Sequence, residues 1–415
     1  MINYINSISF ILKNNFFFLL LCIYPYALIS GPFLSDIIVI VLTFYLIIKS
    51  IIEKNFKIYK KIYFYLFIIF CIYISFNSIF NSKDFISIKS SVPYFRFGFF
   101  ALAVHFILEN NSEKLKIFFY CLISIIFILS IDSIFQKVFG FNMIGMEINH
   151  EIRISSFFGD ELILGSYVIK FLPITLAFII YLKKEINLNF IFMILIVSLF
   201  PILLSAEKTA FLSFILFCIF IIFVMKYKFQ VKLLLILTIF SLIFVVLSLN
   251  KNTKFRLIEV YARNMMDTNS IYTQVHLSHF KTAYKMYLDK PIYGHGPKMF
   301  RFKCSDAKYM YDEFSCSTHP HNFYLQLISE TGLIGLSFLI YFYSYLIIML
   351  SKAIRLKKFI ITKEKLPYSI MVCSLLITFL PISTSGNIFN NWLSSINFFS
   401  IGILLFFIEN IKIKN

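Results

Sequence analysis

The sequence predicts an all-α polytopic membrane protein with about twelve transmembrane helices. Apolar residues make up 59% of the 415 positions, charged residues only 14%, and the mean hydropathy is +0.82. A soluble globular protein of this size does not hide so much apolar side chain. Uninterrupted apolar runs of about 20 residues recur from end to end, and each is long enough to cross a hydrocarbon core of ~30 Å as a helix.

The twelve predicted spans belong to a single integral membrane domain, residues 1–415. The first ends at Ala27–Gly31 and resembles a signal peptide, but a second span follows within a few residues, so we interpret it as a retained helix. The spans lie at about 15–31, 33–50, 61–80, 92–109, 115–136, 162–182, 188–205, 209–226, 231–249, 322–350, 367–384 and 390–409.

The net charge of +18 follows the topology. With the N-terminus in the cytoplasm, the short cytoplasmic connections collect 21 of the 39 Lys and Arg residues, and the short external ones hold five: Lys83, Lys89, Lys137, Arg153 and Lys208. This asymmetry is the positive-inside bias, and it predicts that both termini are cytoplasmic. The basic charge therefore does not indicate a nucleic-acid partner.

A hydrophilic loop, residues 251–320, separates the ninth and tenth spans on the external face. Four of the seven histidines lie in it, and His321 directly follows. The pattern predicts short helices at Lys251–Met266 and Thr273–Asp289, the second capped at Asn269–Ser270, and a turn at 293–297. Loops of this length are usually functional or disordered, and the Tyr, Phe and His content favours order.

Cys304 and Cys316 are the two loop cysteines. An oxidising compartment lets them close a disulfide, and the alternative is two unpaired thiols. The five other cysteines lie inside predicted spans, where cysteine acts as a small apolar side chain.

The segment Thr318-His319-Pro320-His321-Asn322 opens the tenth span. A residue in the first turn of a helix lies near unpaired N–H groups and the positive end of the dipole, which disfavour an imidazolium. We therefore expect His321 to be neutral, as a general base requires. The alternative is an interfacial histidine that only bonds a loop.

A metal site is the second possibility, built from His276, His279, His295, His319 and His321. The H-x-x-H spacing on a helix has no third ligand at a definite distance along the chain, so we predict neither metal nor cofactor.

Charged residues in or beside spans are expected to be paired or functional, because they are costly in lipid. These are Arg96, Lys170, Lys208 and Glu330. Lys208 and Arg153 lie at external helix ends, where they contact lipid phosphate or bind the diphosphate of a lipid-linked substrate. We expect Glu330 to be a structural partner of one of these cations. Gly332 and Gly335, one turn apart, predict close helix approach.

His321-Asn322, nine residues and then Gly332-x-x-Gly335 resembles the signature of the O-antigen ligase and O-antigen polymerase superfamily. The spans, the loop after the ninth span and the Pro291–Pro297 turn are similar too. The resemblance implies inverting, metal-independent glycosyl transfer at the periplasmic face of the bacterial inner membrane. The donor would be an undecaprenyl-diphosphate-linked glycan, and the acceptor a hydroxyl of lipid A-core.

Carried over by residue, the resemblance makes His321 the general base and His319 a positioning residue, with Asn322 structural. The family has an arginine at the outer start of the eighth span, where this chain has Lys208, and one on the loop helix, where it has His276. The nearest upstream arginines are Arg263 and Arg256, and Arg153 or Arg301 is expected to supply the missing cation.

Two alternatives stay open. A polymerase would use a second lipid-linked glycan as acceptor, and the overall look of the loop favours the ligase. A twelve-helix transporter would show two related halves. We find no such repeat, and the histidine-rich loop has no role in transport.

Overall fold

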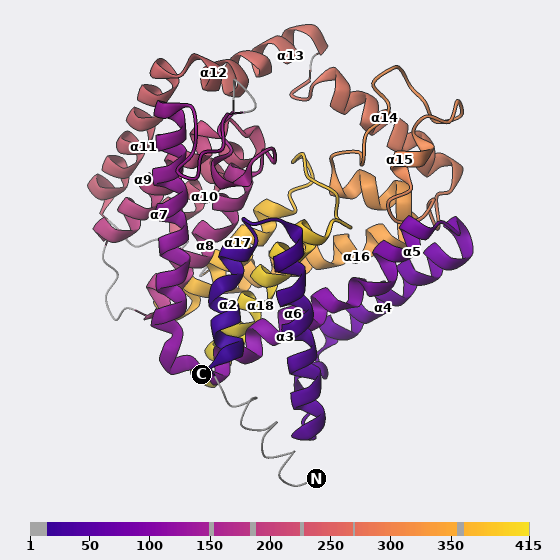
Figure 1. Cartoon of the computed structure of the whole chain (residues 1–415), viewed down its shortest axis with the longest axis horizontal. Coiled ribbons are helices and arrows are strands. Elements are labelled where there is room, and N and C mark those ends of the chain that lie inside the picture. Colours follow the sequence, from indigo (N-terminus) through magenta and orange to yellow (C-terminus); the bar gives the residue numbers. More distant parts are fainter. Residues whose placement is uncertain are drawn as a thin grey trace. The chain divides into compact units, whose positions relative to one another are not determined.

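The computed structural model describes residues 15–148, 153–182, 188–224, 228–268, 270–354 and 361–414, and these form helices without any β-strand (Figure 1). Within these ranges eight helices are long and apolar enough to cross a membrane: Pro32–Ile52, Ile62–Ser82, Phe85–Asn110, Ser112–Phe139, Leu164–Leu182, Phe229–Leu249, Phe323–Ala353 and Asn391–Asn410. A helix also occupies each of the other four predicted spans. The polytopic helical class is confirmed, and the count of twelve spans stays a prediction.

The chain divides into two compact units. The first comprises the residues up to Glu113, Thr273–Tyr345 and Phe379–Glu409. Its helices are α2 (Phe16–Ala27), α3 (Pro32–Ile52), α4 (Ile62–Phe76), α5 (Phe85–Ser91), α6 (Phe95–Asn110), α14 (Gln274–Asp289), α15 (Phe300–Lys303), most of α16 (Phe323–Ala353) and most of α18 (Asn391–Lys414). Tyr24, Phe100 and Phe399 meet in its core, with the Tyr24 ring 4.7 Å from that of Phe399.

The second unit comprises Lys114–Tyr272, Leu346–Thr378 and the residues from Asn410 on. Its helices are α7 (Leu115–Phe139), α8 (Leu164–Leu182), α9 (Leu188–Leu204), α10 (Lys208–Val224), α11 (Phe229–Leu249), α12 (Lys251–Lys254), α13 (Val260–Thr268) and α17 (Leu366–Thr378). α8 is the centre of this unit and packs against α7, α9 and α17. Its residues from Phe171 to Ile180 are all buried, which explains why this span is apolar on every side.

The loop helices follow the prediction with two differences. Residues 251–268 are helical, but a π-helical segment, Phe255–Glu259, joins α12 to α13. α14 is capped by Thr273, whose side chain accepts a hydrogen bond from the His276 N–H. The predicted cap, Asn269–Ser270, was three to four residues earlier. Asn269 lies outside the described residues, and Ser270 instead accepts a bond from the Tyr272 N–H.

A break in α16 is the feature that positions the site. Gly332 has φ 64° and ψ −167°, which interrupts the helix. A Cβ at Gly332 would collide with the backbone of Ile292, so only glycine fits. The prediction that this glycine permits close approach of another helix was therefore wrong: it admits a loop. Gly335 instead faces the Thr331 side chain of its own helix.

The loop at Pro291–Gly296 satisfies the backbone groups that the break releases. Leu333 N–H donates to Pro291 O at 2.9 Å, and His295 N–H donates to Ser329 O at 3.1 Å. A polar face of α4 and its π-helical extension (Asn77–Ser82) completes the set: Tyr73 donates to Thr331 O, Asn77 to Tyr293 O and Asn81 to Gly294 O. Non-helical backbone at membrane depth is tolerated only when it is satisfied in this way.

Candidate functional site

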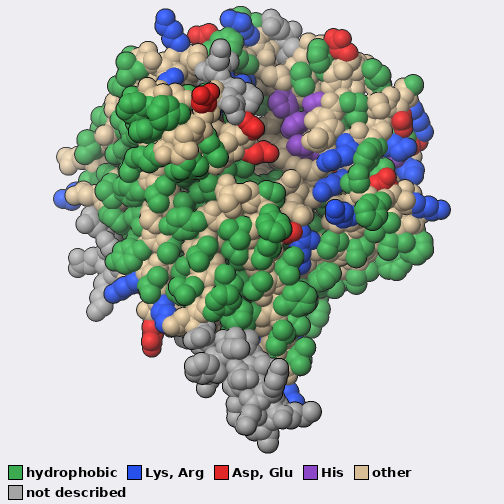
Figure 2. Space-filling model, in the orientation of Figure 1, with side chains coloured by type: hydrophobic (Ala, Val, Ile, Leu, Met, Phe, Trp, Pro, Cys, Tyr) green, Lys and Arg blue, Asp and Glu red, His purple; other side chains and the backbone are tan. Residues whose placement is uncertain are grey.

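Four imidazole rings meet in the first unit. His276 and His279 come from α14, and His319 and His321 come from the segment before α16. The His321 ring centroid lies 4.1 Å from that of His319 and 5.3 Å from those of His276 and His279. Figure 2 shows histidine side chains gathered on the visible face, with Lys and Arg side chains nearby. We call these four residues the histidine cluster.

His321 lies just before the helix rather than in its first turn, which corrects the sequence-based expectation. Asn322 is the cap: its side-chain oxygen accepts from the N–H groups of Tyr324 and Leu325 at 3.0 and 3.1 Å. The backbone of His321 is left-handed, with φ 56°. Such a conformation is uncommon outside glycine and occurs often at functional sites.

Hydrogen bonds fix the orientation of the rings. His319 Nε2 lies 3.1 Å from Ser385 O, and because a carbonyl only accepts, this nitrogen carries the proton. Its Nδ1 therefore accepts from the Thr318 hydroxyl, at 2.8 Å. His321 Nε2 lies 3.1 Å from the Ser317 hydroxyl.

Burial favours the neutral form of three of the four imidazoles. Burial lowers the pKa of His321 to about 3, and the neighbouring His319, His276 and His279 add to this effect. Burial also lowers the pKa of His319 to about 4, and that of His279 in the same direction. The neutrality of His321 thus follows mainly from desolvation and not, as expected, from the helix dipole.

Residues 379–390 form a loop that was not predicted, because the predicted span 367–384 covers half of it. α17 ends at Thr378. Asn322 Nδ2 donates to Pro381 O at 2.7 Å, and Ser385 N–H donates to His321 O at 2.9 Å. The run Ser383-Thr384-Ser385-Gly386-Asn387 is the signal in the sequence, since such clusters mark loops.

Cys304 and Cys316 are joined by a disulfide, with their Cα atoms 5.1 Å apart. Cys304 packs with Ala283, Met286 and Phe300, which anchors this end of the disulfide to α14. The carbonyl of Cys316 bonds the His279 ring. The disulfide therefore connects the loop helix to the segment that carries His319 and His321.

Glu330 is bound by backbone rather than by the cation that we expected. Its two carboxylate oxygens accept from Lys298 N–H at 2.9 Å and Phe300 N–H at 3.1 Å, and Gln326 donates at 3.0 Å. Glu330 thus holds the 298–300 turn against α16.

Arg301 is a cation beside the cluster, and Lys298 lies near Arg301. The positive charge of Arg301 contributes to the low pKa of His319. Burial lowers the pKa of Lys298, and Arg301 adds to this effect.

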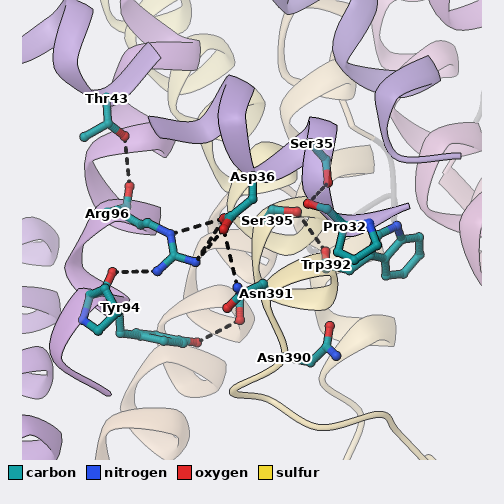
Figure 3. A network of polar contacts seen from close by, with 12 residues as sticks. Pro32, Ser35, Asp36, Thr43, Tyr94, Arg96, Asn390, Asn391, Trp392 and Ser395 are labelled. Carbon is teal, nitrogen blue, oxygen red and sulfur yellow. Dashed lines mark hydrogen bonds and ion pairs between the residues drawn. The ribbon is translucent and has the colours of Figure 1, made fainter. Parts of the chain in front are cut away.

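Arg96 is paired with Asp36, at 2.9 Å from Nη2 to Oδ1 (Figure 3). Asn391 also donates to Asp36, so this pair joins α3, α6 and α18.

A second group of cations lies in the second unit. Arg153 donates to Ser205 O at 3.0 Å and to Leu162 O at 2.7 Å, and its Nη2 lies 3.8 Å from Glu207. Glu207 accepts from Gly165 N–H at 2.7 Å, at the start of α8. The charge of Arg256 acts on both Arg153 and Lys208. Arg256 was predicted only as one of the nearest upstream arginines, and it lies in the π-helical segment Phe255–Glu259.

The remaining predicted residues are accounted for individually. Arg263 is exposed and lies over the Phe255 ring at 5.2 Å. Lys170 is in α8. His295 lies outside the cluster, and its Nε2 donates to Met286 O at 3.0 Å. In the part of the chain that the structure describes, no three His, Cys, Asp or Glu side chains are arranged to hold a metal ion.

Fold and site together define an integral membrane protein with a histidine cluster at the mouth of a broken helix. The family model for O-antigen ligase matches residues 191–340, a range that contains the whole cluster. The match supports the resemblance to the O-antigen ligase superfamily, since residues 191–340 of this chain are similar to that family. No curated protein matches the sequence.

Proposed function

We propose that the chain catalyses inverting transfer of a glycan from an undecaprenyl-diphosphate carrier to an acceptor hydroxyl, with lipid A-core as the acceptor. The observation that carries this proposal is the half-buried His321, stacked among three other imidazoles and with a pKa lowered by burial, inside the region matched by the O-antigen ligase family. The orientation follows the positive-inside bias, with the site at the periplasmic face of the inner membrane.

His321 is the general base in this mechanism. It takes the proton of the acceptor hydroxyl while the oxygen attacks the sugar C1 from the face opposite the diphosphate, and the C1–O bond to phosphate breaks. The leaving diphosphate is already an anion, so it needs neutralising charge and no proton. No metal or cofactor takes part in these steps.

The donor itself strengthens the base. An imidazole with a pKa near 3 is a weak proton acceptor. In the reacting complex the diphosphate is attached to the carbon under attack, so its negative charge comes near His321. A negative charge within ~4–6 Å raises the pKa of an imidazole. His321 therefore becomes an effective base once the donor has bound.

For the second unit by itself, we propose that Lys208 and Arg153, with Arg256 beside them, bind phosphate. Arg256 repels both of these cations, and the carboxylate of Glu207, which lies 3.8 Å from Arg153, also holds the start of α8 through its hydrogen bonds. A bound phosphate group would relieve that repulsion. We propose that Arg301 and His276 bind the glycan. Arg263, whose side chain is exposed, is proposed as a further substrate-binding residue. His319 positions His321.

His321→Gln tests the base. Glutamine retains a hydrogen bond to Ser317 but cannot accept the proton, so we expect transfer to fall by about 10²–10⁴-fold. The measurement is transfer of a labelled glycan from lipid diphosphate to lipid A-core in proteoliposomes. The matched control is His295→Gln, a buried loop histidine outside the cluster, which should keep transfer. Wild-type transfer by folded His321→Gln would end the proposal.

The same assay separates ligase from polymerase. With lipid A-core replaced by a second lipid-linked glycan, a ligase forms no elongated lipid-linked product. Elongation with that acceptor, and none of the lipid A-core product, would assign the chain as a polymerase.

A further inference from the structure

Five buried polar atoms beside the histidine cluster have no hydrogen-bond partner within the described ranges. They are His279 Nδ1, Thr282 Oγ1, Arg301 Nε, Ser385 Oγ and Asn387 Nδ2. Three of these side chains belong to residues that are more than nine-tenths buried: His279 is 3% exposed, Thr282 0% and Asn387 7%. Leaving such a group unsatisfied costs roughly as much as losing a hydrogen bond, so each one requires a physical reason.

The orientation of Asn387 is fixed by its partners. Its Oδ1 accepts from Gln326 Nε2 at 2.9 Å and from Phe389 N–H at 2.8 Å. Because both partners are donors, the atom that they contact is the oxygen, and Nδ2 retains both of its protons. Gln326 is fixed in turn, since its Oε1 accepts from Ile388 N–H at 3.0 Å.

Ser385 is held just as firmly through its backbone. Its N–H donates to His321 O and its carbonyl accepts from His319 Nε2. The hydroxyl therefore lies on the residue that touches both histidines of the segment before α16. Tyr94 donates to Ile388 O at 3.2 Å, which stiffens the same loop from α6.

The opposite side of the group comes from α14 and α15. The His279 ring stacks on that of His321 with an interplanar angle of 27°. Since its Nε2 donates to the Cys316 carbonyl, Nδ1 is an acceptor. Thr282 lies one turn further along the helix. Arg301 follows Phe300, whose ring centroid is 6.4 Å from that of His279.

The chemistry of the five atoms is that of a sugar site with one anionic position. They offer a guanidinium N–H, an amide NH₂, two hydroxyls and an imidazole lone pair, and three of the residues, His279, Ser385 and Asn387, are held in place by other bonds. Hydroxyl groups of a sugar match the four neutral atoms, since each both donates and accepts. The unpaired Nε of Arg301 offers one charged N–H, and a guanidinium is the group that best matches a carboxylate.

We propose that His279, Thr282, Arg301, Ser385 and Asn387 form a subsite for a sugar residue that carries a carboxylate, next to the hydroxyl that His321 deprotonates. This inference rests on the proposed function, because it names the class of glycan that the same site accepts. It makes Arg301 a residue that selects for acidic sugars.

The test measures binding alone, by saturation-transfer NMR on the full chain in nanodiscs. The probes are methyl β-glucuronide, methyl β-glucoside and inorganic phosphate. We expect the glucuronide to bind at least about tenfold more tightly than the glucoside, because only the carboxylate forms a charged bond with the guanidinium. Phosphate should not displace it at equal concentration. Equal binding of the two glycosides, or displacement by phosphate, would overturn the proposal.

Variants locate the binding. Arg301→Gln should abolish the preference for the glucuronide. Ser385→Ala should weaken the binding of both glycosides several-fold. The matched control is Ser383→Ala, in the same loop, whose hydroxyl already bonds Thr384 O and which should bind like wild type. If Arg301→Gln does not fold, Arg301→Lys keeps the charge without the guanidinium and should still reduce the preference. A preference unchanged in either folded Arg301 variant contradicts the subsite.

His321→Gln separates this inference from the proposed function. That variant should bind the glucuronide normally while failing to transfer. A wild-type chain that prefers the glucuronide but transfers no glycan would contradict the proposed function alone. A chain that transfers glycan and shows no preference would contradict the subsite alone.

Discussion

Lowering the pH adds protons to the unfolded chain before it adds them to the folded one. The pKa values of His319 and His321 are about 4 and about 3 in the folded protein, against about 6.5 in the unfolded chain. Between these limits the unfolded state binds more protons, so the free energy of unfolding falls as the pH falls. Each group contributes a slope of up to about 1.4 kcal/mol per pH unit.

We therefore expect the melting temperature in detergent to drop between pH 6.5 and pH 4. His319→Gln should reduce that slope, because glutamine can keep the bond to Ser385 O and does not titrate. Thermal unfolding across this pH range is the measurement. A melting temperature that is independent of pH, in both proteins, would show that the two imidazoles are not neutral by burial.

The break in α16 belongs to the scale of elements, and Gly332 tests it. Alanine at this position must adopt a positive φ and also collide with the Ile292 backbone. Gly140→Ala is the matched control, because Gly140 has φ 83° with nothing within 4 Å of the added Cβ. We expect Gly140→Ala to cost about 1 kcal/mol and Gly332→Ala clearly more. Equal melting temperatures would mean that the 291–293 loop does not occupy the break.

The disulfide acts on the same scale, since it fastens α14 and the segment before α16. Replacing Cys304 and Cys316 by serine should lower the free energy of unfolding by about 2–4 kcal/mol. Cys121→Ser, outside the loop, is the control and should have little effect. Denaturant unfolding with and without reductant provides the measurement. The prediction would be contradicted if reductant left the free energy of unfolding of the wild type unchanged and the double serine variant had the same stability.

Topology is a property of the whole molecule. The distribution of Lys and Arg predicts a cytoplasmic C-terminus and an external loop at 251–320. A fluorescent protein fused to the C-terminus should therefore fluoresce, and alkaline phosphatase fused after residue 310 should be active. The opposite pair of results would invert the orientation and place the histidine cluster in the cytoplasm.

The sequence by itself determined the membrane class, the approximate positions of the apolar helices and His321 as the candidate base. These depend on local patterns: apolar run length, and a polar motif at the mouth of an apolar segment. Local sequence patterns also explain α14, because its start and end were predicted within about two residues.

Only the tertiary structure decided which groups His321 meets. Ser385 is 64 positions away along the chain, and His279 is 42 positions away in the other direction; no local pattern pairs them. Glu330 was predicted to pair with a cation, and Gly332 to allow close approach of another helix. Instead, Glu330 binds the 298–300 turn and Gly332 admits the backbone of Ile292, so both hold the segment before α15. The reason is that backbone groups freed inside a membrane helix must be satisfied, and the segments that satisfy them are distant in sequence.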